Sequence, residues 1–139
     1  MITYYTDGSC SPNPGPGGYA VVLDGQPVVL GAEAESTNIR MEAMALIDAL
    51  KHADGTECQV HTDSEFWINV VTKWSIAWEA NGWTKKNGQI KNLDLVKELC
   101  ALHKESNALL VWVKAHNGTE GNELADHWAN EARAGKTLN

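Results

Sequence analysis

The sequence of 139 residues has no apolar run close to the ~20 residues that a membrane-spanning helix needs, so no such helix is expected. Its first residues lack the basic segment, apolar core and small-residue cleavage site of a secretory signal. Cysteine is scarce, and the spacing of Cys10, Cys58 and Cys100 suits neither a disulfide framework nor a zinc site. We therefore expect reduced thiols and a cytoplasmic protein without a membrane partner.

Positive charge is also scarce, with 11 Lys and Arg against 18 Asp and Glu and a formal net charge of -7. Such a balance argues at first sight against a nucleic-acid partner, because phosphate binding needs a positive face. The charge is unevenly distributed, however, since residues 73–105 hold six lysines and only four acidic residues. The segment 73–105 is therefore the candidate for contact with a phosphate backbone.

The remaining composition is ordinary for a globular protein, with 43% hydrophobic and 21% charged residues. No internal repeat or linker is evident, so residues 1–139 are expected to form a single domain. The first strand is expected at Ile2–Thr6, and Asp24-Gly25 marks a hairpin between strands at Tyr19–Leu23 and Pro27–Leu30. The Pro- and Gly-rich stretch Ser11–Gly18 is expected to form neither a helix nor a sheet ladder.

The rest of the chain alternates between helical and strand patterns. Either Thr37 or Asn38 can cap a helix that runs to Ala53, with Glu42 at the N-terminal end of its buried stripe. Further strands are expected at residues 58–62 and 108–113, and helical segments at 65–71, 74–83, 92–104 and from Asn122 onward. This order predicts an α/β fold, a mixed sheet with helices packed on it.

Four acidic residues are candidates for one metal site. Asp7 and Asp63 each follow a strand, Glu42 faces the sheet from its helix, and Asp126 lies in the first turns of the last helix. Crowded carboxylates repel unless cations bridge them, and hard oxygen ligands favour Mg²⁺ or Mn²⁺. Two such ions about 4 Å apart hydrolyse phosphodiesters in many enzymes. The alternative is that the Asp residues only form turns and that Glu42 faces solvent.

The motifs occur in an order that resembles type 1 ribonuclease H over the whole chain. The matching segments are residues 6–9, 13–18, 38–42, 62–64, 112–116 and 121–126, with the sequences TDGS, NPGPGG, NIRME, TDS, WVKAH and GNELAD. The resemblance implies the ribonuclease H-like fold, a five-stranded mixed sheet with three antiparallel and then two parallel strands and helices on both faces. It also implies a monomer.

The resemblance implies an endonuclease that cuts the RNA strand of RNA/DNA hybrids by a two-metal mechanism and leaves 5′-phosphate and 3′-hydroxyl ends. Asp7, Glu42, Asp63 and Asp126 match the family's catalytic, metal-binding carboxylates. His116 matches its catalytic histidine, which assists proton transfer or product departure. Two Mg²⁺ ions are the implied cofactor, with Mn²⁺ as a substitute.

The resemblance also implies substrate contacts. The main chain around Gly8 and Ser9 approaches the RNA, and the groove-contacting and phosphate-binding positions match Cys10, Asn13, Thr37 and Asn38. Trp74 matches a contact on the family's basic protrusion. Several of these residues have a plainer interpretation, namely packing for Cys10 and Trp74, a turn for Asn13 and a helix cap for Asn38.

The sequence departs from the family pattern on the substrate side. Residues 79–81 read Glu-Ala-Asn where bacterial relatives often carry basic residues, and Asp24 and Glu35 stand where arginine is common near the phosphate pocket. We therefore expect weak, salt-sensitive binding of the hybrid. Two rival functions are a hybrid-binding module that cannot cut, and an integrase, transposase or exonuclease of the same superfamily; a reverse transcriptase domain is a third.

Overall fold

The computed structural model describes residues 1–86, 88–115 and 117–138. Five strands form one sheet in the order β3-β2-β1-β4-β5. Strands β1, β2 and β3 are antiparallel neighbours, whereas β4 lies parallel to both β1 and β5. The strands are β1 (Ile2–Cys10), β2 (Gly15–Leu23), β3 (Gln26–Ser36), β4 (Cys58–Thr62) and β5 (Ala108–Trp112).

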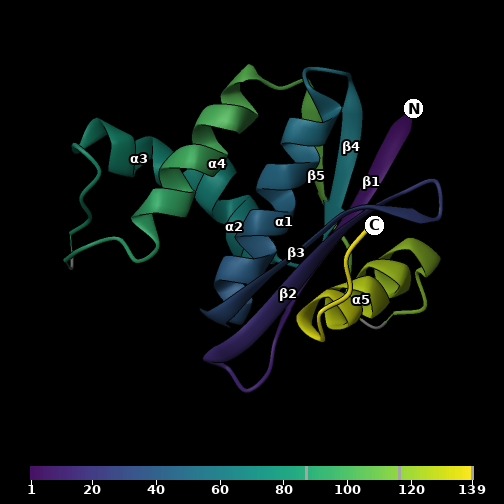
Figure 1. Cartoon of the computed structure of the whole chain (residues 1–139). Coiled ribbons are helices and arrows are strands. Elements are labelled where there is room, and N and C mark those ends of the chain that lie inside the picture. Colours follow the sequence, from purple (N-terminus) through teal and green to yellow (C-terminus); the bar gives the residue numbers. More distant parts are fainter. Residues whose placement is uncertain (87, 116, 139) are drawn as a thin grey trace.

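Helices cover both faces of the sheet, as Figure 1 shows. Helix α1 (Asn38–Ala53) and helix α4 (Leu93–Glu105) pack together on one face, and α5 (Glu120–Arg133) lies on β1 and β2 at the other. Helix α3 (Ser75–Ala80) projects farthest from the sheet. The mixed α/β architecture predicted from the element order is confirmed. None of the helices in the described part of the chain is long and apolar enough to span a membrane.

The main core lies between the sheet and α1. Successive side chains of a strand point to opposite faces, so Tyr4 of β1 and Val60 of β4 enter this core together. Leu46 on α1 and Trp67 are completely buried against them. Trp67 also donates its indole N–H to the main-chain oxygen of Ile39 at 2.8 Å, which fixes the start of α1 against the segment that follows β4.

The expectation that Ser11–Gly18 forms no ladder is wrong for its second half. Strand β2 begins at Gly15, and its glycines pair with β1 at Ser9–Gly18 and Cys10–Gly17. Pro16 is accommodated because the β2–β3 pairing has a register shift between Gly15 and Gly17, where no ladder hydrogen bond from residue 16 is needed. The glycines fit this strand because neighbouring elements approach it closely: a β-carbon on Gly18 would overlap α5, and one on Gly17 would overlap Met41 of α1.

The helix expected at residues 65–71 is longer and irregular. It consists of α2 (Glu65–Asn69), a π-helical turn η1 (Val70–Trp74) and then α3. The hydroxyls of Thr72 and Ser75 donate to the carbonyls of Ile68 and Val71, one turn earlier, and such bonds distort the regular helical ladder. The widened turn brings the rings of Trp74 and Trp78 to 6.3 Å between centroids, on one face as expected.

Other boundaries differ by a few residues. Strand β3 continues to Ser36 rather than ending at Leu30, because β3 is an edge strand and tolerates the polar alternation of Glu33 and Glu35. Strand β5 ends at Trp112, one residue early. Helix α5 begins at Glu120, two residues before the start that was expected at Asn122.

Candidate active site

The sheet brings the two aspartates together at one edge. The expected end of the first strand at Thr6 is wrong, because β1 stays paired with β2 as far as Cys10 and Asp7 lies within it. Since β1 and β4 are parallel neighbours with Tyr5 opposite His61, Asp7 of β1 lies beside Asp63, which directly follows β4. Glu42 completes the group from α1. Carboxylate oxygens of Asp7, Glu42 and Asp63 all lie within 4.8 Å of one another.

Glu42 is positioned by the first turns of α1. The side chain of Thr37 caps the helix by accepting from the Arg40 amide at 3.2 Å, so Thr37, and not Asn38, is the cap. Glu42 is half-buried and receives a hydrogen bond from the Ser64 side chain, the residue after Asp63. Ser64 itself caps α2, since its hydroxyl oxygen accepts from the Trp67 amide. The start of α2 therefore supports the carboxylate that α1 supplies.

Asp126 reaches the group from the opposite face of the sheet. Its half-buried carboxyl lies in hydrogen-bonding contact with that of Asp7. Helix α5 approaches closely because Gly18 has no side chain, and a β-carbon there would overlap the main chain of α5 at Arg133 and Ala129. All four acidic residues predicted from the sequence therefore lie in one place, although Asp126 is not among the three whose oxygens are all within 4.8 Å.

Crowding and burial make this group unfavourable in its fully ionised form. Burial raises the pKa of Asp7 to about 9, and the charges of Asp63 and Asp126 add to the effect, while the Gly8 N–H, 2.9 Å from the carboxylate, opposes it. Burial, followed by the charge of Asp63, raises the pKa of Glu42 to about 7. Carboxylates that are buried and repel one another, and that offer only oxygen ligands, suit hard divalent cations such as Mg²⁺ and Mn²⁺.

The residues predicted to contact the substrate form a connected rim beside the carboxylates. The side-chain oxygen of Asn38 accepts from the main-chain N–H of Cys10 at 2.7 Å. The main-chain N–H of Asn38 donates to the side-chain oxygen of Asn13 at 3.2 Å. Among the described residues, the side-chain N–H₂ groups of Asn13 and Asn38 have no hydrogen-bond partner, so both can donate to other acceptors. Cys10 is buried, and its thiol lies 3.3 Å from three main-chain oxygens, which favours the packing interpretation of its side chain.

A hollow of about 600 Å³ adjoins this rim. Pro14 and Ile39 form apolar parts of its wall, and hydrogen-bond donors come from Asn13, Thr37, Lys91 and Asn92, the last at the start of α4. The side-chain oxygen of Asn92 accepts from Arg40 at 3.2 Å, and Arg40 also makes a two-pronged bond to Asp94 at 3.3 and 3.2 Å. Sequence reasoning missed this use of Arg40, because its partners lie more than fifty residues away on another helix.

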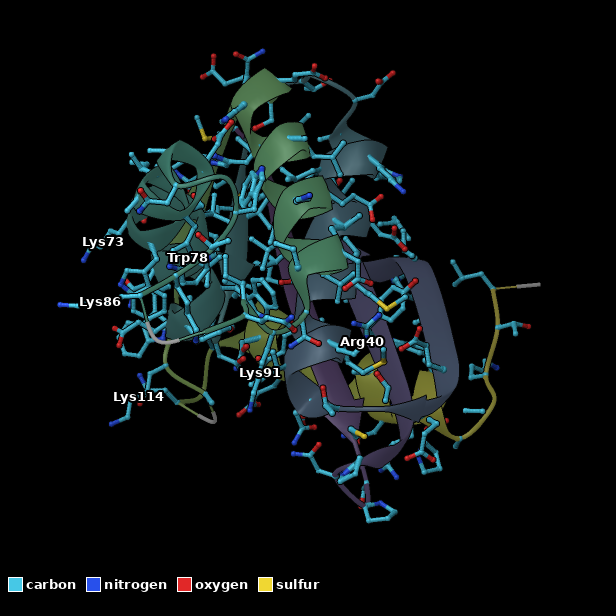
Figure 2. All side chains as sticks on the ribbon, turned by 90° about the vertical axis from the view of Figure 1, so that its left-hand side faces the viewer. Arg40, Lys73, Trp78, Lys86, Lys91 and Lys114 are labelled. Atoms are coloured by element: carbon cyan, nitrogen blue, oxygen red, sulfur yellow. The ribbon has the colours of Figure 1, made fainter. Side chains whose placement is uncertain are left out.

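A second, more apolar groove of about 260 Å³ runs between α1 and the protrusion that carries α3. Trp74 and Trp78 line it from one side, and Lys85 and Lys91 are at its margin. Trp74 is 41% exposed, so its ring is available for contact. Figure 2 shows that the labelled lysines Lys73, Lys86 and Lys114 point outward on the same side of the molecule. Two lysines of the segment 73–105, Lys85 and Lys91, thus give this groove a basic margin.

His116 lies outside the described residues, so its predicted role stays a prediction. The two flanks of its loop are described: Lys114 follows β5, and Thr119 precedes α5.

Comparison with known proteins identifies the family. The family model described as RNase H matches residues 1–134. The chain belongs to the RNase H family. This confirms the resemblance seen in the sequence motifs, and it classes the chain as an endoribonuclease.

Curated relatives and a solved structure agree with the assignment. The chain is 44% identical over 138 residues to Ribonuclease H of Syntrophomonas wolfei, a match that covers 94% of each. It is 42% identical over 141 residues to Ribonuclease H of Methylorubrum extorquens, covering 96% of this chain but only 62% of that relative. LC9-RNase H1, a type 1 RNase H with the type 2 active-site motif, matches with a TM-score of 0.84 and 29% identity, over 98% of this chain and 73% of that one.

The departures from the RNase H pattern lie outside the carboxylate group. Asp24, in the β2–β3 turn, and Glu35, on β3, are both exposed. Neither lines the hollow that contains Thr37 and Asn13. Two cationic groups do lie near that hollow: Lys91, which lines it, and Arg40, which bonds to Asn92.

Proposed function

We propose that this chain hydrolyses the RNA strand of RNA/DNA hybrids in a reaction that needs divalent metal ions, leaving 5′-phosphate and 3′-hydroxyl ends. The observation that carries the proposal is the group of Asp7, Glu42 and Asp63, with oxygens within 4.8 Å of one another and Asp126 in contact with Asp7. In a member of the RNase H family, such a group has a direct use in phosphodiester hydrolysis.

The four carboxylates would hold two Mg²⁺ ions, for which Mn²⁺ can substitute. Bound there, the ions supply charge stabilisation at the scissile phosphate and an acidified water. The chain's own contribution is geometric and electrostatic. Burial of Asp7, which is 5% exposed, excludes bulk water from one side of the group. The four carboxylates are fixed before any substrate arrives, because they come from four separate places in the fold: β1, α1, the end of β4 and α5.

We propose that His116 moves a proton during the reaction, either to the departing oxygen or during release of the product. The proposal rests on its place in the family's motif, between Trp112 and Gly121. An imidazole suits the task because its usual pKa lies near neutrality.

We propose that the hybrid lies across the rim, the hollow and the groove. Main-chain groups at Gly8 and Ser9 would face the RNA strand, next to the carboxylates. The free amide ends of Asn13 and Asn38 suit the minor groove, where 2′-hydroxyls distinguish RNA from DNA. The Cys10 main chain supports Asn38, the hollow at Thr37 suits a phosphate of the DNA strand, and Trp74 stacks or packs against that strand at the groove.

The test is cleavage of labelled RNA/DNA hybrid, double-stranded RNA and double-stranded DNA, each with Mg²⁺ or with chelator. The expected result is cleavage of the RNA strand alone, in the hybrid alone and with metal alone. Asp7→Asn is expected to abolish it, whereas the control Glu57→Gln, an exposed acid before the opposite end of β4, leaves it unchanged. Binding of the hybrid by wild type without any cleavage would favour the binding-module alternative instead.

We further propose that residues 1–139 act as one domain and as a monomer in the cytoplasm. The single sheet, which takes strands from the first and second halves of the sequence, supports a single unit. Sedimentation velocity is expected to give one species near the chain mass of 15.2 kDa. A stable dimer at micromolar concentration would contradict the proposal.

A further inference from the structure

Strand β1 and helix α5 run alongside each other in a matched register. Two residues of a strand advance about 6.6 Å, and four or five residues of a helix advance about 6 to 7.5 Å. Contacts therefore repeat in three steps along the two elements. Tyr5 packs on Gly121, where a β-carbon would overlap its ring, Asp7 meets Asp126, and Ser9 meets Asn130.

The third step is a closed set of hydrogen bonds that includes a cation. Ser9 donates its hydroxyl to the Asn130 side-chain oxygen at 2.7 Å. Arg133 donates from Nε to the Ser9 hydroxyl oxygen at 3.2 Å, and from Nη2 to the Asn130 oxygen at 3.1 Å. Asn130 in turn donates its amide to the main-chain oxygen of Asp126 at 3.0 Å. The bonds lead from the guanidinium to the residue that carries the fourth carboxylate.

The second step needs support from its neighbours. Asp7 and Asp126 are like-charged when ionised, and their repulsion acts to separate α5 from β1. The Tyr5–Gly121 contact holds one side of the pair and the Ser9–Asn130–Arg133 set holds the other. Arg133 is half-buried, and its main chain packs on Gly18 of β2. The position from which its side chain extends is therefore fixed.

We propose that Arg133 is a positioning residue for the metal site: through Ser9 and Asn130 it holds Asp126 at the distance from Asp7 that divalent ions require. The inference rests on the proposed function, since it concerns how the four carboxylates are prepared for those ions. Arg133 touches neither substrate nor ions in this role. Its two-pronged donation, rather than its charge alone, is what orders the set.

Groups that orient metal ligands typically change metal affinity 10–100-fold when they are removed. Arg133→Ala is therefore expected to weaken Mn²⁺ binding roughly tenfold in calorimetry, without substrate present. Arg133→Lys keeps the positive charge but cannot donate to Ser9 and Asn130 from two nitrogens of one planar group. Its Mn²⁺ binding is expected to remain several-fold weaker than that of wild type. The KM for hybrid at saturating Mg²⁺ is expected to stay within about twofold, while the Mg²⁺ concentration for half-maximal rate rises.

Two further variants separate positioning from general stability. Asn130→Ala breaks the same set without touching a charge, and is expected to weaken Mn²⁺ binding as Arg133→Ala does. Tyr19→Phe removes a hydrogen bond from β2 to Asp48 of α1, and is expected to retain wild-type Mn²⁺ affinity even where its melting temperature falls. Circular dichroism identifies any variant that does not fold, in which case Asn130→Ala carries the comparison.

Each remaining outcome has one meaning. Wild-type Mn²⁺ affinity in folded Arg133→Ala or Asn130→Ala would overturn the positioning role and leave the proposed function intact. An equal loss in Tyr19→Phe, or full rescue by Arg133→Lys, would also overturn it. Failure of the wild-type chain to bind Mn²⁺ at all would overturn the proposed function itself.

Discussion

A β-carbon on Gly8 would lie 2.5 Å from the amide nitrogen of Glu42, closer than packed atoms can approach. The same β-carbon would lie 2.5 Å from the carbonyl carbon of Met41. Helix α1 thus touches β1 main chain to main chain, immediately after Asp7. This contact sets how far the Glu42 carboxylate stands from that of Asp7.

Gly8→Ala is expected to destabilise the chain by about 2–4 kcal/mol, because neither main-chain segment can move aside without disturbing a buried core. It is also expected to lower kcat more than it raises KM, because Glu42 is displaced. Chemical denaturation and steady-state kinetics on labelled hybrid measure the two effects. Gly25→Ala, in an open turn with a φ of 78°, is the control: it strains a turn but leaves kcat unchanged.

The stability of the metal-free chain is expected to fall as pH rises from about 4 to about 9. The folded pKa of Asp7, about 9, lies above its ordinary value of 3.8, and that of Glu42, about 7, lies above 4.5. The folded state therefore holds protons that the unfolded state releases, and their contribution is full below the ordinary pKa values and lost as pH passes the folded ones. Melting temperatures in chelator across this range measure the trend.

Asp7→Asn is expected to flatten that pH profile and to raise the stability of the metal-free chain near pH 8 by about 1–3 kcal/mol, since a buried carboxylate no longer ionises. Added Mg²⁺ is expected to stabilise wild type and not the variant, because cations replace the lost protons. A variant that melts like wild type at every pH would show that Asp7 is not the group that titrates.

Arg40→Ala is expected to lower the free energy of unfolding by about 1–2 kcal/mol and to raise KM for the hybrid, because Asn92 and Asp94 lose their shared partner. Lys51→Ala, also on α1, breaks an exposed ion pair with Glu98 of α4 and is expected to cost under about 0.5 kcal/mol, with no change in KM. A KM equal to wild type in Arg40→Ala would exclude a role for the Asn92 hollow in binding.

Salt is expected to raise KM more steeply than it lowers kcat, because the contacts at the basic margin are phosphate contacts. Replacing Lys85 and Lys86 together by Ala is expected to weaken hybrid binding. It is also expected to make the slope of log binding constant against log salt concentration shallower by about 1–2. Replacing Lys51 and Lys104, whose ammonium groups pair with Glu98 and Glu79, is the matched control. An affinity that salt does not change would remove the basis for this interpretation.

Sequence patterns predicted the parts of this site that depend on periodicity. Asp7 and Asp63 could be placed together because each was expected just after a strand of one sheet; this holds for Asp63, whereas Asp7 lies inside β1, which continues to Cys10. Glu42 followed from its phase on a capped helix. The pairing of β2 from Gly15 onward was missed, because local propensity disfavours Gly and Pro in strands, whereas the close approach of α5 requires a glycine at Gly18.

Long-range polar contacts had no signal in the sequence. The two-pronged bond from Arg40 to Asp94 and the Ser9–Asn130 hydrogen bond join residues 54 and 121 positions apart. Nothing in the local spacing specifies either partner, since the sheet register and the seating of α5 decide both. The π-helical turn at Val70–Trp74 was missed for a related reason: hydroxyls that bond back to the main chain compete with the regular helix.

The four acids occur in the order Asp7, Glu42, Asp63, Asp126, and the last belongs to an element that is seated on β1 and β2. A nascent chain emerging from the ribosome thus carries three of the four while the fourth is still to be translated. Docking of α5 is the step that completes the set. If the proposed function holds, we expect competence for cutting only once α5 has docked, because a chain that ends before residue 126 lacks the fourth carboxylate.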